Sequence, residues 1–370
     1  NKWRVHFVPR EVGEWSWSVS LRTGENVAIS ANQDAGVAVE ADGSAGEFLV
    51  TESDKTGRDH RGKGFLSYVG ERYPRFDNGE YLLKAGADAP ETLLAYRDFD
   101  NTYDHGGGNS IKNFDVHVGD WRPGDPVWQE GKGKGLIGAL NYLADKNMNA
   151  FSFLTMNVDG DGKNVWPWIT HVDRYRYDVS KLAQWEVIFS HADTLGLFLH
   201  FKTQETENDL LLDGGELGPA RRLYYRELIA RFGHHLALNW NLGEENDTWE
   251  ELADPDETRV KSYVRYIREL DPYGHPIVIH SYPDQQTEVY KPLLGAKIGL
   301  AGPSLQTQIE DVHVDTQRWV RESADAGAQW MVANDEVGPA NVGIKPDGED
   351  NNHFDTRYRA LWGNLMAGGA

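Results

Sequence analysis

Seven short apolar runs recur along the last three quarters of the chain, and they constrain its fold more than any other feature. They lie at residues 80–86, 149–156, 195–201, 236–242, 275–281, 296–302 and 328–334. Near-continuous apolar runs of this length are typical of parallel strands that are buried on both faces. Stretches with helical periodicity lie between most of them, so the pattern predicts a (β/α)₈ TIM barrel, an α/β fold that typically needs about 250 residues.

Two of the intervening stretches carry clear helix signals. In residues 254–270, Asp254 is expected to cap a helix that has Pro255 at its first position, followed by apolar residues at steps of three and four. In residues 220–232 aromatic and aliphatic residues step by four, and Gly233 is placed as the glycine that follows the helix. Only seven strands can be found, and a helix-like stretch at 355–366 lies close to the last residue. We therefore expect the eighth strand to be missing from this chain.

The first 70 residues have a β-type pattern instead. Alternation at 3–7 and again at 15–19, around a turn-like segment, predicts a β-hairpin, and residues 36–40 and 47–51 could form further short strands. This region resembles part of a β-sandwich, although a complete sandwich needs about 100 residues. The sequence thus suggests a small, incomplete β-sandwich segment and linker at 1–70, with the polar stretch 52–64 as the linker, followed by a barrel at 71–370.

The charge of the chain narrows its partners. There are 37 basic and 58 acidic residues, a net charge of −21, which disfavours binding to nucleic acid or to an anionic membrane surface. No run approaches the roughly 18 apolar residues of a membrane span. There is no cysteine, so thiolate chemistry is excluded. The first residues lack the apolar core of a signal peptide, so the protein is either cytosolic or its leader is not in this chain.

Two of the predicted strands end by presenting acids. Glu244 and Glu245 follow the run at 236–242, and Asp335 and Glu336 follow the run at 328–334. Acids at such positions can simply cap the following helices, but two such strand ends in one βα pattern point to a shared site. A barrel places its chemistry at the carboxyl ends of its strands, and glycoside hydrolysis needs two carboxyls that flank the scissile bond.

On these residues the chain resembles the clan A retaining glycoside hydrolases. Their Leu-Gly-Asn-Glu pattern aligns with residues 242–245, which implies that Glu245 is the general acid/base and that Glu336 is the nucleophile, with Asp335 as the other possibility. Glu244 stands where the family has an asparagine that binds the sugar 2-hydroxyl. We expect hydrogen bonds to keep Glu336 ionised.

The segments KAGADAPETLLAYRDFD, GKGLIGALNYLADK, DGKNVWPW and LWGNLMAGGA resemble a bacterial group with an immunoglobulin-like domain before an apiosidase-like or cellulase-like barrel. This resemblance implies a secreted or periplasmic retaining glycosidase that acts on a polysaccharide or oligosaccharide.

Further residues at predicted strand ends are expected to contact the substrate. Trp166 and Trp168, in the loop after the second strand, are candidates for a platform that stacks on sugar rings, and the resemblance implies that His280 and Tyr282 hold the nucleophile. The long segment 103–130 is expected to form a lid. The predicted substrate-binding residues are Glu244, Asn157, Trp166, Trp168, His200, Lys202, His280, Tyr282, Asp88 and Gln306.

Two alternatives were weighed against this interpretation. A metal-dependent hydrolase would use residues such as His200, Glu205, His234 or His235, but no ligand spacing such as HExxH is present, and the last two precede a strand, at the wrong face. No metal or cofactor is therefore expected. A carbohydrate-binding barrel without catalytic activity remains open as the alternative function.

Overall fold

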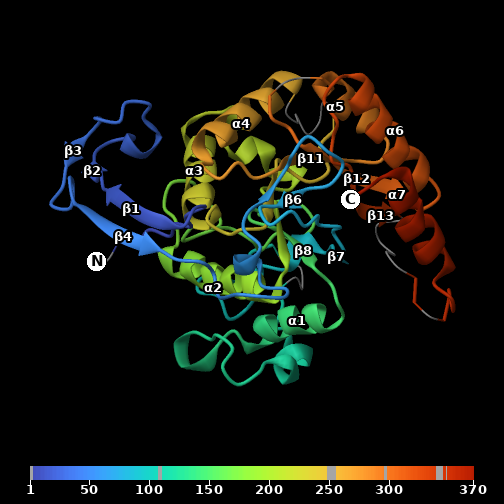
Figure 1. Cartoon of the computed structure of the whole chain (residues 1–370), viewed down its shortest axis with the longest axis horizontal. Coiled ribbons are helices and arrows are strands. Elements are labelled where there is room, and N and C mark those ends of the chain that lie inside the picture. The colour runs from blue at the N-terminus through green and yellow to red at the C-terminus, as the bar shows by residue number, and fades with distance from the viewer. Residues whose placement is uncertain (1–2, 107–110, 248–255, 296–297, 339–344, 347) are drawn as a thin grey trace.

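The computed structural model describes residues 3–106, 111–247, 256–295, 298–338, 345–346 and 348–370. Seven parallel strands form one curled sheet in the order β13-β12-β11-β10-β9-β8-β7, and helices surround it, which is the architecture of a (β/α)₈ barrel (Figure 1). The strands are β7 (Gly86–Ala87), β8 (Ala150–Leu154), β9 (Phe198–Lys202), β10 (Leu238–Asn241), β11 (Ile277–Ser281), β12 (Gly302–Gln308) and β13 (Ala333–Gly338). No eighth strand joins β7 to β13 within the described residues.

The helices of the barrel are α1 (Lys134–Asp145), α2 (Val179–Leu195), α3 (Pro219–Phe232), α4 (Glu257–Leu270), α5 (Gln286–Tyr290), α6 (Val312–Asp325), a π-helical stretch at Asp355–Trp362 and α7 (Gly363–Ala367). Asp178 caps α2 by accepting from the amides of Ser180 and Lys181. Asp256, rather than Asp254, caps α4, and residues 254–255 lie outside the described residues. Gly233 ends α3 at φ −64°, so the expected left-handed glycine cap does not form.

Short 3₁₀ turns connect these elements. They lie at Val27–Ile29, His60–Gly62, Pro90–Thr92, Asp115–Asp120, Gln129–Gly131, Thr206–Leu211, Asp213–Gly215 and Lys291–Leu293. No helix among the described residues is long and apolar enough to cross a membrane.

Four of the seven apolar runs coincide with strands, and three are displaced. The runs at 149–156, 195–201, 236–242 and 275–281 contain most or all of β8 to β11. The runs at 80–86, 296–302 and 328–334 end where β7, β12 and β13 begin, and residues 296–297 lie outside the described residues. The reason is that much of β12 and the middle of β13, residues 334–336, consist of polar residues, which a search for apolar runs passes over.

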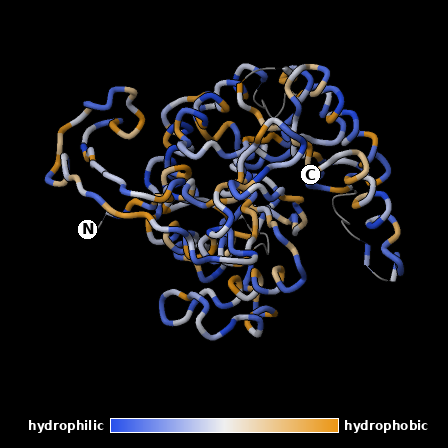
Figure 2. Tube along the Cα trace, in the orientation of Figure 1, coloured by the Kyte–Doolittle hydropathy of each residue, from blue (hydrophilic) through white to orange (hydrophobic). Residues whose placement is uncertain are grey.

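The core lies between the sheet and its helices. The buried set includes Phe153, Trp185, Phe189, Phe201, Phe232, Trp240 and Trp319. In Figure 2 hydrophobic stretches recur along the central trace, and hydrophilic stretches dominate the outer loops and helices. A second, smaller cluster closes the amino ends of the strands, where Leu66 and Phe76 from the strands β5 (Leu66–Ser67) and β6 (Arg75–Phe76) meet Phe198 and Ala237.

The N-terminal segment forms two antiparallel pairs that project from the barrel in Figure 1. Strand β1 (Gly13–Ser18) pairs with β4 (Ala45–Val50), and β2 (Arg22–Thr23) pairs with β3 (Val37–Ala38). The predicted hairpin between residues 3–7 and 15–19 is therefore wrong, because alternation specifies which side chains share a face but not which strand is the partner. Residues 3–12 instead run along the barrel, where Arg10 donates to the carbonyl of Tyr273.

Candidate active site

Side chains from neighbouring strands converge at the carboxyl end of the barrel, which we call the mouth. Lys202 ends β9, Glu244 follows β10, His280 lies in β11, Gln306 in β12 and Glu336 in β13. The strand register places Gln306 beside Glu336. One ligating atom from each of Glu244, His280 and Glu336 lies within 4.8 Å of the others. The structure thus brings together residues that lie more than 130 positions apart.

Gln306 connects the two predicted catalytic glutamates. Its Nε2 donates to Glu245 Oε1 at 2.9 Å and to Glu336 Oε1 at 2.6 Å. Because one nitrogen contacts both oxygens, the two oxygens are at most about 5.5 Å apart. The carboxyls of Glu245 and Glu336 therefore face each other across a gap that a single amide spans.

Glu245 is held in a fixed loop. Its backbone has φ 54°, in the left-handed region that a residue with a side chain rarely adopts. The amide of Asn246 stabilises the loop by donating to the carbonyls of Gly243 and His280. Tyr282 hydrogen-bonds Glu245. The expectation that Tyr282 contacts the nucleophile is therefore corrected: it contacts the acid/base candidate.

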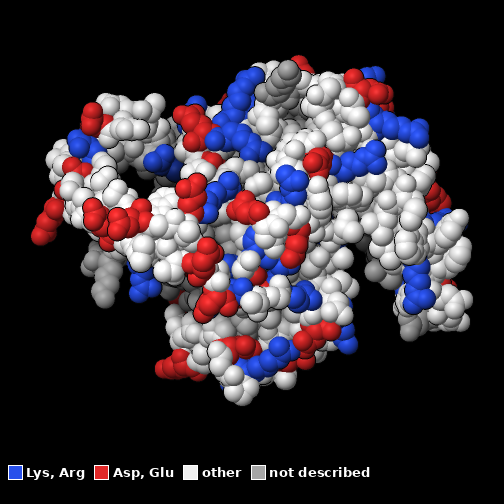
Figure 3. Space-filling model, viewed as in Figure 1, with Lys and Arg blue, Asp and Glu red and all other residues white. Residues whose placement is uncertain are grey.

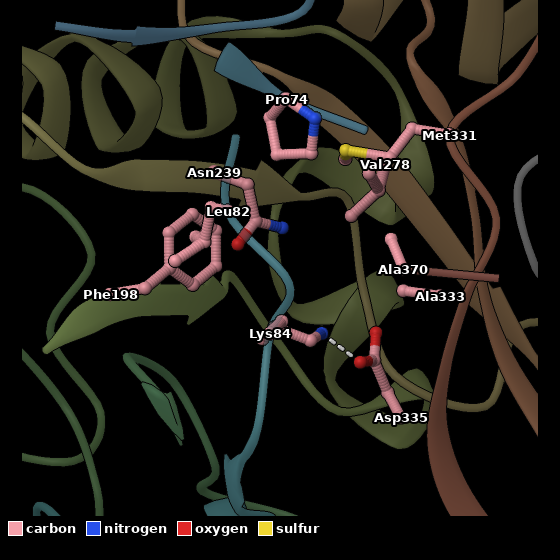
Figure 4. Close-up of a pocket in the computed structure, with 10 residues that line it drawn as sticks. All are labelled: Pro74, Leu82, Lys84, Phe198, Asn239, Val278, Met331, Ala333, Asp335 and Ala370. Carbon is pink, nitrogen blue, oxygen red and sulfur yellow. Dashed lines mark hydrogen bonds and ion pairs between the residues drawn. The ribbon is translucent and has the colours of Figure 1, made fainter. Parts of the chain in front are cut away.

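A β-bulge distinguishes Asp335 from Glu336. The register between β12 and β13 shifts at Leu305/Gln306, so that Asp335 is the extra residue of β13. Its side chain is 3% exposed, forms an ion pair with Lys84 and accepts from Ser304 Oγ at 2.5 Å. Figure 4 shows this pair among apolar residues that include Leu82, Phe198 and Met331. The Glu336 side chain is 20% exposed, so only Glu336 is accessible from the mouth.

Burial changes the ionisation of Glu336 and of its neighbour His280. Burial raises the pKa of Glu336 to about 7, even though Lys202 and the amide of Gln306 favour the ionised form. The expectation that hydrogen bonds keep Glu336 fully ionised is thus wrong near neutral pH, because desolvation outweighs them. His280 Nε2 lies 3.6 Å from Glu336 Oε2. Burial and the nearby ammonium groups of Lys202 and Lys84 lower the pKa of His280, so it stays neutral.

Lys202 supplies the positive charge beneath the mouth. Its ammonium is fully buried, forms an ion pair with Glu244 and lies 3.3 Å from Asp88 Oδ1. Burial opposes this charge, but Asp88 and Glu244 raise the pKa of Lys202 above its usual value. Glu244 occupies the place where the resembling family has asparagine, and here it is bound to Lys202. Burial, with the charges of Asp88 and Glu91, raises the pKa of Glu244 despite the ion pair.

Another buried carboxyl lies next to this group. Asn157 is fully buried and donates from Nδ2 to Glu205 Oε2 at 3.0 Å. Burial and the neighbouring Glu244 raise the pKa of Glu205 to about 10, so its carboxyl is protonated at neutral pH. His200 is also buried, below the mouth, where its Nε2 accepts from Asn241 Nδ2 at 3.1 Å. Asn157 and His200 thus support the mouth from beneath rather than forming its surface.

The structure does not place the two predicted platform tryptophans on a surface. Trp166 and Trp168 are both 0% exposed. Trp166 packs against Tyr103 and under the ammonium of Lys181. Trp168 packs against Tyr177 and Tyr224 in the core. Neither ring offers a face to a sugar, and this prediction is corrected: the two residues contribute to packing.

The predicted lid at 103–130 also has a different place. Residues 107–110 lie outside the described residues. In the remainder, Asp120 accepts through its carbonyl from Asn141 of α1, and Trp128 stacks on Phe99. Residues 111–130 therefore lie against α1 and its surroundings, on the outside of the barrel, whereas Tyr103 and His105 pack against Trp166 in the loop after β8.

Among the described residues, two groups of side chains have the composition of a metal site. The first is Glu244, His280 and Glu336 at the mouth, where the ammonium of Lys202 already pairs with Glu244. The second is His6, Glu186 and His234, at the amino ends of the strands. His234 and His235 do lie at the end of the barrel away from the mouth, as the sequence indicated. A metal-dependent hydrolase that combines them with the mouth residues is therefore excluded by geometry.

Comparisons with known proteins identify the fold. No family model and no curated protein matches the sequence. Among solved structures, a candidate glycoside hydrolase from Bacteroides vulgatus superimposes with a TM-score of 0.59 at 14% identity, over 89% of this chain and 55% of its own. A glycoside hydrolase family 5 structure from the same organism gives 0.53 at 17% identity, over 85% and 62%.

An exo-β-1,4-mannosidase from an Opitutaceae bacterium gives a TM-score of 0.52 at 14% identity, over 82% of this chain and 53% of its own. The present chain therefore spans between about half and two thirds of the length of these structures. The three likenesses show that the chain has the barrel fold on which glycoside hydrolases are built.

Proposed function

We propose that the protein is a retaining glycoside hydrolase with Glu336 as the nucleophile and Glu245 as the general acid/base. The observation that carries this proposal is the single amide nitrogen of Gln306, which contacts both carboxyls and limits their oxygens to about 5.5 Å apart. Retaining glycosidases separate their carboxyls by about 5–5.5 Å, whereas inverting enzymes leave about 6.5–9.5 Å for a water molecule.

The residues of the mouth can be assigned to the two steps. In the first, Glu336 attacks the anomeric carbon while Glu245 gives its proton to the departing glycosidic oxygen. In the second, Glu245 takes a proton from water, whose oxygen displaces Glu336 from the sugar and forms the free hemiacetal. Gln306 donates to both carboxylates and Tyr282 hydrogen-bonds Glu245, so the two groups keep their relative orientation in both steps.

The charge of the mouth suits a transition state with positive character. Glu336, Glu245, Glu244 and Asp88 surround it, the carboxyl of Glu205 is protonated, and Lys202 neutralises part of this charge from beneath. A sugar that develops charge at its anomeric carbon is stabilised by such carboxylates. The ion pair between Glu244 and Lys202 takes the place of the family's asparagine, so we expect the sugar 2-hydroxyl to meet a charged pair.

The proposed substrates are polysaccharides or oligosaccharides, and the proposed site of action is outside the cytoplasm or in the periplasm. One of the structures with the same fold is an exo-β-1,4-mannosidase, which makes β-1,4-mannans and their oligomers the first substrates to test. The acidic surplus of the chain also fits a neutral substrate better than an anionic one. Figure 3 shows acidic and basic side chains interspersed on the displayed face.

The test is a turnover screen on plant and algal glycans that records the anomer of the first product by NMR. Glu336→Gln and Glu245→Gln should each lower kcat by at least about 10³-fold, and Glu322→Gln on the exposed face of α6 is the matched control with unchanged turnover. A product of inverted configuration would overturn the retaining mechanism. Glycan binding without turnover in the wild type would favour the alternative, a carbohydrate-binding barrel.

A further inference from the structure

A second group of polar side chains lies at the base of the barrel, at the opposite end from the mouth. We call it the base cluster: His6, Glu186, Asp193, His234 and His235. His234 and His235 lie in the turn between α3 and β10, and Glu186 and Asp193 lie in α2. His6 belongs to the N-terminal segment that runs along the barrel, and its ring centroid is 4.8 Å from that of His234. Three separate segments thus meet at one point.

The three outer members have the geometry of ligands to one ion. One ligating atom from each of His6, Glu186 and His234 lies within 4.8 Å of the others. His234 Nε2 is 3.2 Å from Glu186 Oε1, and two ligands of a tetrahedral zinc ion with bonds of about 2.0–2.1 Å are about 3.3 Å apart. Without an ion, the Nε2–H of His234 donates to Glu186 across this distance, and a zinc ion would take the place of that proton.

The inner members support Glu186 as a ligand. His235 Nε2 lies 3.3 Å from Glu186 Oε2, and its Nδ1 lies 2.6 Å from Asp193 Oδ2. His235 thus orients Glu186, and Asp193 in turn holds His235. Ligands in metal sites are commonly oriented by such hydrogen bonds.

An ion can also reach this point. A cavity of about 420 Å³ opens beside the cluster and is lined by Val8, Arg10, Phe65, Asp193 and His234, among others. His6 is exposed, so its imidazole can be reached from solvent. An entry path for an ion is therefore present.

We propose that His6, Glu186 and His234 bind a zinc ion at the base of the barrel, and that this ion ties the N-terminal segment to α2 and to the α3–β10 turn. Two imidazoles and one carboxylate favour zinc over calcium or magnesium, which prefer oxygen ligands alone. Three protein ligands leave the fourth tetrahedral position to water. This site is independent of the function proposed for the mouth.

The test is isothermal titration of the whole chain, freed of metal, with zinc chloride. One zinc ion per chain should bind, and His6→Ala should weaken the affinity by at least about tenfold, because an exposed ligand is lost without disturbing the core. His313→Ala, which replaces another exposed histidine in α6, should bind zinc as the wild type does. Calcium chloride should give no saturable heat.

A second measurement tests whether the bound ion also holds residues 3–12 against the barrel. Hydrogen exchange of residues 3–12 should slow when zinc is added to the wild type and should not change in His6→Ala. Absence of stoichiometric zinc binding, or equal affinity of His6→Ala and the wild type, would overturn the proposal. Binding that leaves the exchange of residues 3–12 unchanged would overturn the role of the ion as a tie.

Discussion

The mouth and the base cluster are built from the same acidic residue types, yet their carboxyls shift in opposite directions. At the mouth, burial raises the pKa of Glu336 to about 7 and that of Glu205 to about 10. At the base, burial acts in the same sense, but the pKa values of Glu186 and Asp193 fall below their usual range. The difference is the partner: His234 and His235 hydrogen-bond Glu186 and His235 hydrogen-bonds Asp193, whereas several mouth carboxyls share the ammonium of Lys202.

This comparison shows that burial alone does not set the charge of a carboxyl. A carboxylate with its own cationic donors stays charged and stabilises the fold, whereas carboxylates that compete for one cation become ready to take up a proton. At the mouth this condition leaves Glu336, the proposed nucleophile, only partly ionised near neutral pH. The largest change in this difference between mouth and base is expected when the shared cation, the ammonium of Lys202, is removed.

Lys202→Met should destabilise the protein by about 3–5 kcal/mol at pH 8, because the loss of one partner leaves Glu244 and Asp88 charged without compensation. At pH 5 the loss should be smaller, since carboxyls with raised pKa values can protonate. Urea unfolding at both pH values measures this. Lys181→Met is the matched control, because Lys181 is also buried but donates to the carbonyls of Asn101 and Trp166. The loss in free energy of unfolding that this substitution causes should depend little on pH in this range. Equal losses at both pH values for Lys202→Met would contradict the assignment.

Glu336→Gln should stabilise the fold above pH 7 by about 2–3 kcal/mol relative to the wild type. The folded-state pKa of about 7 lies above the ordinary value of 4.5, so ionisation of Glu336 destabilises the folded chain as pH rises from about 4.5 through 7. Below pH 4.5 the wild type and the variant should unfold at similar urea concentrations. The control Glu322→Gln, at an exposed carboxyl of the helical pair Arg318–Glu322, should stay within about 0.5 kcal/mol of the wild type at every pH.

His235→Gln should remove a pH dependence of the same sign in a higher pH range, worth about 1–3 kcal/mol. Burial lowers the pKa of His235, but Asp193 and Glu186 raise it to about 9, from an ordinary value of 6.5. The stability that this charge contributes is fully present below pH 6.5 and is lost as pH rises through 9. Thermal unfolding between pH 6 and pH 10 in the presence of a chelator should show this loss in the wild type and in His313→Gln. A loss of the same size in His235→Gln would sink the interpretation.

The sequence predicted most of the barrel and much of the mouth. Strand ends carry acids at 244–245 and 335–336, and the structure brings Glu245, Glu336 and Gln306 into contact. The limits of β12 and β13 were missed because the residues of a site are polar, so the strands that matter most for function give the weakest apolar signal. The exposure of Trp166 and Trp168 could not be predicted either, since an aromatic residue in a loop after a strand can turn inward as easily as outward.

The base cluster could not be predicted from the sequence, because its residues lie far apart along the chain. His6, Glu186 and His234 lie in three segments with no common motif, and the closest two are 48 residues apart. The docking of residues 3–12 on the barrel depends on contacts such as those of Arg10 with Tyr273 and Phe65, which no local pattern encodes. Single-sequence analysis therefore finds sites that follow the repeat of the fold, and it misses sites where an unrelated segment crosses that repeat.

The β-bulge in β13 determines on which face of the strand each of the following side chains lies. Side chains alternate between the two faces of a strand, so one additional residue reverses the face of everything that follows it. Here that residue allows Asp335 to bind Lys84 while Glu336, directly next to it, lies beside Gln306 at the mouth. Deletion of either residue would restore regular pairing with β12 and leave one carboxyl for the two positions. The length of this strand is thus as much a part of the site as the chemical identity of its side chains.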